Sequence, residues 1–147
     1  MTQPNKTVDR RSKTILGVDD SEEIQTLLHA IITNAGYSYL SAENADRAMS
    51  VVVSHNPFDV ILLDVEMPGV DGYTLCGRIR KHPKGKSVPI VFLTFHNTVV
   101  DVEKCKLAGG NAFITKPFTG KTLLQHLDHW AARQVEPQEG TRLASNS

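Results

Sequence analysis

The sequence predicts an α/β protein in which five helices flank a doubly wound, five-stranded parallel sheet. Strand-like and helix-like patterns alternate along the chain, which is typical of successive βα units. The strand-like segments are short apolar runs, as expected for parallel strands that are buried on both faces. The length of 147 residues suits one domain with one full core.

The first βα unit contains the clearest helix of the chain. A strand is expected at Thr14–Val18, and Asp20 can cap the helix that follows, with Glu23 completing a capping box. Gly36 is expected to end this helix. Apolar residues at helical spacing form its buried face: Ile24, Leu27, Leu28, Ile31, Ile32 and Ala35.

The second unit begins with a short strand, predicted at Tyr37–Leu40. Asn44 can cap the next helix, and the Asn56–Pro57 pair breaks it. Its buried face is expected to consist of Ala45, Ala48, Met49, Val52 and Val53. The third strand, Phe58–Leu63, is nearly all apolar, so we place it at the centre of the sheet.

The third and fourth units are separated by a polar loop at Lys81–Ser87. Asp71 can cap the third helix, whose inward residues are Leu75, Cys76 and Ile79. The fourth strand is predicted at Val88–Leu93. The fourth helix, Thr98–Ala108, is weakly patterned and ends at Gly109–Gly110; its best apolar positions are Val99, Val102 and Cys105.

The fifth unit completes the predicted domain. Its strand, Ala112–Thr115, leads through Lys116-Pro117-Phe118 into a helix at Thr119–Arg133, which buries Leu123, Leu124, Leu127, Trp130 and Ala131. We therefore divide the chain into a polar arm (1–13), one domain (14–133) and a tail (134–147). The tail is rich in Glu, Gln, Gly, Ser and Asn, a composition that predicts disorder.

Composition excludes several classes of protein. The formal net charge is zero, so no overall field attracts nucleic acid or a membrane surface. No apolar run approaches the roughly 20 residues that span a bilayer, and the N-terminus has no secretory apolar region. Cys76 and Cys105 lack the spacing of metal ligands, so we expect reduced, partly buried thiols and a cytoplasmic protein.

Polar side chains end four of the apolar runs. Asp19 and Asp20 follow the first strand, Asp64 ends the third, Thr94 ends the fourth, and Lys116 follows the fifth. In a doubly wound sheet, ligands bind beyond the carboxyl ends of the strands, so all these side chains are expected to face one crevice. Carboxylates this close repel one another unless a cation joins them, which points to Mg²⁺ and phosphoryl chemistry.

The order and spacing of these motifs resemble the receiver domain of two-component response regulators. The resemblance covers about residues 14–132 and rests on the acid pair, the stretch Asp64-Val65-Glu66-Met67-Pro68-Gly69-Val70-Asp71-Gly72, Thr94, and Lys116-Pro117-Phe118. It implies a flavodoxin-like sheet with strand order 2-1-3-4-5. It also implies a protein that is not an enzyme with a separate substrate, but a phosphoacceptor that catalyses its own phosphorylation and dephosphorylation.

The same resemblance implies a role for each site residue. Asp64 is the expected phosphoryl acceptor, because a carboxylate can attack phosphorus and hold an acyl phosphate. Mg²⁺ (or Mn²⁺) is expected on Asp19, Asp20, Asp64 and the backbone carbonyl of Glu66. Lys116 is expected to pair with Asp64 and then with the phosphoryl oxygens, and its bond to Pro117 resembles a cis peptide of the family.

Two further residues resemble the family's conformational switch. The Thr94 hydroxyl is expected to move to the phosphoryl group, with the rotamer of Phe113 following it. Added phosphoryl charge can then bias a two-state segment that runs from Thr94 through the fifth helix. The implied partners are a sensor histidine kinase or histidine phosphotransfer protein, and a downstream protein on the face of the fourth helix, fifth strand and fifth helix.

Too few residues follow the fifth helix for an output domain, so we expect a stand-alone receiver that acts by binding a partner or relaying phosphate. A receiver domain excised from a longer protein would have the same sequence features. Direct contact with nucleic acid or membrane is not expected.

Two positions depart from the commonest family pattern and leave other functions open. Bulky Phe95 follows Thr94 where a small residue is usual, so phosphorylation by small donors is in doubt and a constitutive binding module is the second hypothesis. Glu66 and His96 add ionisable groups beside the acceptor, and we expect them to tune dephosphorylation. Glu66 also has the spacing of the second acid in an Mg²⁺-dependent aspartyl phosphatase, although the Asp-x-Asp pattern is absent. The hypothesis of a flavin-binding protein has less support still, because no phosphate-binding loop of Ser, Thr or Gly follows the first strand.

Overall fold

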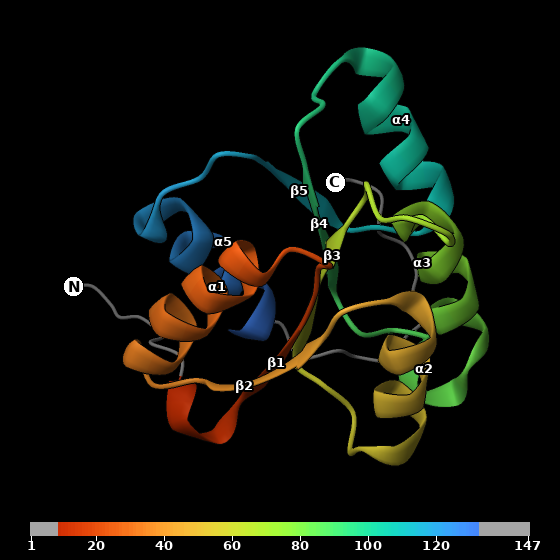
Figure 1. Cartoon of the computed structure of the whole chain (residues 1–147). Coiled ribbons are helices and arrows are strands. Elements are labelled where there is room, and N and C mark those ends of the chain that lie inside the picture. The colour runs from red at the N-terminus through yellow and green to blue at the C-terminus, as the bar shows by residue number, and fades with distance from the viewer. Residues whose placement is uncertain (1–8, 133–147) are drawn as a thin grey trace.

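Five parallel strands form one sheet in the order β2-β1-β3-β4-β5 (Figure 1). The structure is a computed structural model that describes residues 9–132. The strands are β1 (Thr14–Val18), β2 (Ser38–Ala42), β3 (Val60–Asp64), β4 (Ile90–Thr94) and β5 (Ala112–Thr115). The helices are α1 (Glu22–Asn34), α2 (Ala45–Ser54), α3 (Gly72–Lys81), α4 (Val99–Ala108) and α5 (Gly120–Ala132), with short 3-10 turns η1 (Arg10–Ser12) and η2 (Pro83–Gly85). The predicted fold class and strand order are confirmed.

Helices cover both faces of the sheet, so the core has two layers (Figure 1). Successive strand residues point to opposite faces. Ile15 packs with Leu28 and Leu127 on the side of α1 and α5, whereas Leu16 packs with Leu75 and other residues of α2, α3 and α4. Because both faces are buried, the central strands need continuous apolar runs, as the sequence indicated.

The predicted ends of three strands shift toward the carboxyl side. β2 is Ser38–Ala42 instead of Tyr37–Leu40, β3 begins at Val60 instead of Phe58, and β4 begins at Ile90 instead of Val88. Apolar side chains outside the paired registers are also buried, as Phe58 and Val88 show, so hydrophobicity alone does not mark where pairing begins.

Helix caps at Asn44 and Asp71 are as predicted, but the cap of α1 is not. Thr98, predicted as the first residue of the fourth helix, is instead its N-cap. The Ser21 side chain, rather than Asp20, accepts the Ile24 N–H at 3.2 Å, so the capping box with Glu23 is wrong. The turn after β1 includes both acids, and the Ser21 N–H donates to Asp19, so the helix begins later.

Three residues predicted to be buried are exposed. Leu27 and Val53 flank the buried stripes of their helices and are 42% and 46% exposed. Val99 is 79% exposed because α4 begins beyond the strand ends, where the sheet does not cover it (Figure 1). The helix with the weakest sequence pattern is therefore also the one with the most exposed apolar side chains.

The described end of the predicted arm packs on the domain. The Arg10 guanidinium donates to both Asp128 oxygens, at 3.0 and 2.6 Å, and the Tyr37 hydroxyl donates to the same carboxylate at 2.5 Å. Burial alone would raise the pKa of Asp128, but the hydrogen bonds from Arg10 and Tyr37 outweigh it and lower that pKa. The predicted tail, 134–147, lies outside the described residues.

Asp128→Asn is expected to lower the free energy of unfolding by about 1 kcal/mol at neutral pH, because a bidentate charged contact is lost. A carboxyl whose pKa is lowered on folding stabilises the fold above its unfolded pKa of about 4, and this stabilisation is lost as pH falls through the folded pKa. Urea unfolding should therefore show the deficit shrinking below about pH 4. Additive effects of Asp128→Asn and Arg10→Gln at neutral pH would contradict the assignment.

Candidate functional site

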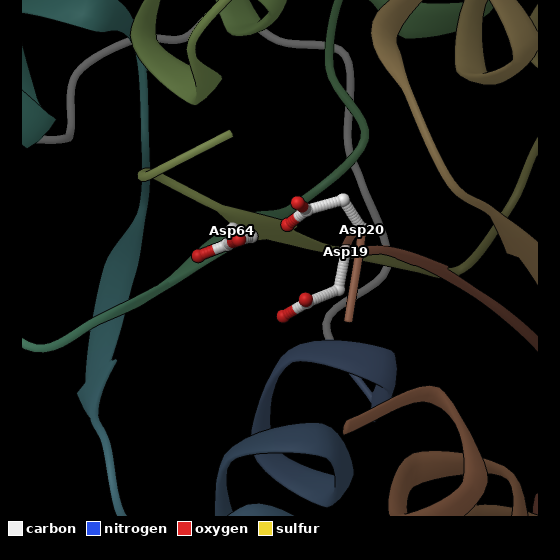
Figure 2. A group of neighbouring side chains, drawn as sticks. All are labelled: Asp19, Asp20 and Asp64. Atoms are coloured by element: carbon white, nitrogen blue, oxygen red, sulfur yellow. The ribbon is translucent and has the colours of Figure 1, made fainter. Parts of the chain in front are cut away.

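Three carboxylates gather at the carboxyl ends of β1 and β3, which are neighbours in the sheet. Asp19, Asp20 and Asp64 each place a carboxylate oxygen within 4.8 Å of the others. Figure 2 shows the three side chains converging from two segments of the chain. Asp19 and Asp64 are buried, whereas Asp20 is exposed. The sequence prediction that these acids meet is borne out by this geometry.

Lys116 places its ammonium between two of these carboxylates. Its Nζ lies 2.9 Å from Asp64 Oδ1 and 3.0 Å from Asp19 Oδ2, and the side chain is buried. Lys116 directly follows β5, so it lies at the carboxyl ends of the strands, as the acids do. β5 is the edge strand on the opposite side of the sheet from β2. The Lys116–Pro117 bond is cis, as the sequence suggested.

Burial and charge act in opposite directions on these groups. Burial, helped by the charge of Asp19, raises the pKa of Asp64 to about 6, although the hydrogen bond from Lys116 opposes this. For Lys116, burial alone would lower the pKa, but the facing carboxylates of Asp64 and Asp19 raise it. Three carboxylates lie close together and the Lys116 ammonium contacts two of them, so a further cation near the cluster is favoured.

The residues present fit a hard divalent cation. Carboxylate oxygens are the ligands that Mg²⁺ prefers, and Mg²⁺ takes one or two carboxylates while it keeps several waters. Exposure of Asp20 leaves room for such waters on one side of the cluster.

Thr94 ends β4 beside Asp64, as predicted, and its side chain is buried. Its hydroxyl donates to Glu66 Oε2 at 3.0 Å and accepts the His96 N–H at 2.9 Å. His96 Nε2 lies 3.5 Å from the same Glu66 oxygen. The Thr94 hydroxyl is thus held by the side chain of Glu66, a contact that the sequence did not indicate.

Two aromatic residues flank this arrangement. Phe95 is 62% exposed, and its ring centroid lies 5.1 Å from Lys116 Nζ, in a cation–π contact. Phe113 is half-buried in β5, paired in register with Phe92, and packs on the core side of α2, α3 and α4. The role of Phe95 in limiting access to Asp64 and the rotamer role of Phe113 therefore stay predictions.

Sequence reasoning missed the residues that contact the backbone of Asp19 and Asp64. The Gln25 amide donates to the backbone of the turn that carries Asp19, and Gly72 packs directly against the backbone of Asp64. Glycine within a strand often marks a close approach, so Gly17 was an available signal for Tyr39, which lies over it.

Comparison with known proteins identifies the family of the chain. The family model for the response regulator receiver domain matches residues 15–128. The chain belongs to the response regulator receiver domain family. It is a phosphoacceptor domain of two-component signalling, and such receiver domains bind Mg²⁺ at an acidic site and interact with histidine kinases.

Individual relatives are similar over most of this receiver domain. The transcriptional regulatory protein YrkP of Bacillus subtilis is 40% identical over 109 residues, covering 74% of this chain and 45% of that protein. Chemotaxis protein CheY4 of Vibrio cholerae superposes with a TM-score of 0.78 at 30% identity, covering 80% of this chain and 98% of that one. The receiver domain of sensor histidine kinase PA1611 from Pseudomonas aeruginosa, with a magnesium ion coordinated in its active site cleft, gives 0.76 at 31% identity and covers 82% and 98%.

The chain spans about half the length of the first curated relatives that it matches. Within residues 9–132, no helix combines the length and the apolar character needed to cross a bilayer.

Proposed function

We propose that Asp64 accepts a phosphoryl group from a phosphohistidine and that the acids around it hold the Mg²⁺ that this transfer needs. The observation that carries the proposal is the bridge of Lys116 Nζ between Asp64 and Asp19, with Asp20 within 4.8 Å of both. The proposed ligands are Asp19, Asp20, Asp64 and the backbone carbonyl of Glu66. We also propose that the transfer takes place in the cytoplasm.

In the proposed transfer, one Asp64 oxygen attacks phosphorus and forms the new P–O bond. The P–N bond to the donor imidazole breaks, its electron pair returns to nitrogen, and the imidazole then takes a proton from solvent. Lys116 is proposed to neutralise charge on the phosphoryl oxygens, and the contact of its ammonium with the Asp64 carboxylate supports this role. Mg²⁺ held by the proposed acids would supply further charge neutralisation for the transfer.

The test is phosphoryl transfer from a panel of labelled histidine kinases, with and without Mg²⁺. Transfer to the wild type is expected to need Mg²⁺ and to disappear in Asp64→Asn. Asp46→Asn, an exposed aspartate on α2, is the matched control and should accept label normally. Label that persists in Asp64→Asn, or a wild type that no kinase labels, would reject the proposal.

Phe95 is the observation that favours the second hypothesis, a constitutive binding module. Its ring contacts the Lys116 ammonium, which in turn donates to Asp64. If the protein is a binding module that never accepts phosphate, Phe95→Ala will not be labelled either. If the ring only restricts access, Phe95→Ala will accept phosphate from acetyl phosphate faster than the wild type.

The aspartyl phosphatase hypothesis predicts turnover of a phosphate monoester, which can be measured with the same preparation.

Output is proposed to act through the face of α4, β5 and α5, either on a downstream protein or by relay to a histidine phosphotransfer protein. Support comes from α4, whose exposed apolar side chains include Val100 at 62% and Leu107 at 85%. Thr94 is proposed to couple this face to Asp64, and its position supports this: it ends β4 next to Asp64 and shortly precedes α4.

Glu66→Gln is expected to lengthen the half-life of the acyl phosphate about threefold. The neutral amide accepts the Thr94 hydrogen bond more weakly than the carboxylate does, by about 1 kcal/mol, so the hydroxyl is freer to bond the phosphoryl group. Loss of label over time measures the half-life, and Glu103→Gln on α4, an exposed glutamate, is the control. An equal or shorter half-life in Glu66→Gln would contradict this interpretation.

A further inference from the structure

The Gln25 side chain, in the first turns of α1, ties together the backbone around the acid pair. Its Nε2 donates to the carbonyl oxygens of Gly17 and Asp19, both at 3.1 Å, and of Ala42 at 3.3 Å. The Asp19 N–H also donates to Ala42 at 3.1 Å. One amide thus joins the ends of β1 and β2 to the turn that carries both acids.

Tyr39 fixes the orientation of this amide. Its hydroxyl donates to Gln25 Oε1 at 2.5 Å, which directs Nε2 toward the three carbonyls. The ring lies directly over β1, because a Cβ on Gly17 would come within 2.0 Å of the Tyr39 hydroxyl oxygen. Glycine at position 17 is therefore what lets Tyr39 reach Gln25 across the strand.

The Asp19 carbonyl and the Asp20 N–H belong to one planar peptide unit, so fixing that carbonyl also fixes where the Asp20 side chain leaves the backbone. Asp19 is held at its side chain as well, by Lys116 and by the Ser21 N–H. The Asp20 carboxylate receives no hydrogen bond within the described part of the chain, so its position depends on the backbone. We propose that the hydrogen-bonded pair of Tyr39 and Gln25, the Tyr39–Gln25 brace, positions the Asp19–Asp20 turn for divalent cation binding. This inference rests on the proposed cation site.

The test measures the dissociation constant of Mg²⁺ by calorimetry for the wild type, Gln25→Leu and Tyr39→Phe. Loss of a residue that orients metal ligands weakens binding about tenfold at the lower end, which we expect for Gln25→Leu. Tyr39→Phe keeps the ring and removes only the hydroxyl, so about threefold is expected. Gln125→Leu, an exposed glutamine on α5, should bind Mg²⁺ like the wild type. The double variant should weaken binding no more than Gln25→Leu alone, because the two residues act as one unit.

A positioning role has a further signature, since saturating Mg²⁺ should restore the rate of phosphoryl transfer to the variants, which a generally disturbed fold would not allow. The backbone amide of Asp20 should also shift its NMR resonance in Tyr39→Phe. An unchanged Mg²⁺ dissociation constant in folded Tyr39→Phe overturns the inference, whether or not Gln25→Leu folds. A wild type that binds Mg²⁺ but is never phosphorylated would instead reject the proposed function, and leaves this comparison of affinities intact.

Discussion

Lys116→Met is expected to lower the free energy of unfolding by about 3 kcal/mol near pH 8 in the absence of Mg²⁺. Methionine fills similar space but removes the ammonium that lies 2.9 and 3.0 Å from two buried carboxylates. Asp64 and Asp19 are then left without a cation in a site that burial already makes unfavourable for charge. This loss exceeds that of a surface ion pair, because both carboxylates are nearly inaccessible to water.

The loss of stability in Lys116→Met is expected to depend on pH and on Mg²⁺. A carboxyl whose pKa is raised on folding, as that of Asp64 is, carries a cost that is absent below its unfolded pKa of about 4 and grows as pH rises through the folded pKa. Without the lysine, that pKa rises further, so the variant should be closest to the wild type near about pH 5. Added Mg²⁺ should stabilise Lys116→Met more than the wild type, because it supplies the missing positive charge.

Urea unfolding at the two pH values, with and without excess Mg²⁺, measures these effects. Lys121→Met replaces an exposed lysine of α5 and is expected to change the stability by less than about 0.5 kcal/mol. Equal stability of Lys116→Met and the wild type at both pH values would show that the ammonium does not neutralise the acids.

The sequence predicted the order and type of every βα unit, because hydrophobic periodicity and capping residues act locally. Gly36 and Gly109, with φ values of +110° and +104°, end their helices where glycine indicated. The ends of β2 and β4 were less accurate, since pairing depends on neighbours that are distant in sequence. The exposure of Val99 could not be predicted from the sequence either, because it depends on where α4 begins relative to the sheet.

The residues of the site were predictable because each ends a strand, and parallel strands bring their carboxyl ends together. The hydrogen-bond partners of these residues were harder to predict. The second contact of Lys116, to Asp19, and the contact of Thr94 with Glu66 depend on rotamers that no spacing in the chain specifies. The contacts of Gln25 join segments from two strands and a helix, so only a three-dimensional structure brings them together.

Gly72→Ala is expected to destabilise the protein by about 2 kcal/mol and to slow phosphoryl transfer, because it acts on the backbone of Asp64, the proposed acceptor. A Cβ at position 72 would lie 2.2 Å from the carbonyl oxygen of Asp64 and 2.9 Å from the Cα of Val65. Both atoms are backbone, so they cannot rotate away, and the start of α3 must move relative to β3. The displaced strand end carries Asp64, whose contact with Lys116 depends on its present position.

Gly77→Ala is the matched control, since Gly77 lies in the same helix but has nothing within 4 Å of a Cβ. There the substitution is expected to raise the free energy of unfolding by about 1 kcal/mol, because alanine favours a helix interior more than glycine does. Urea unfolding and labelling by the same kinase compare the two variants. If both are stabilised alike, the contact between α3 and the Asp64 backbone is looser than the structure shows. If Gly72→Ala is destabilised but accepts phosphate at the normal rate, the glycine serves packing alone and the acceptor tolerates displacement of its strand.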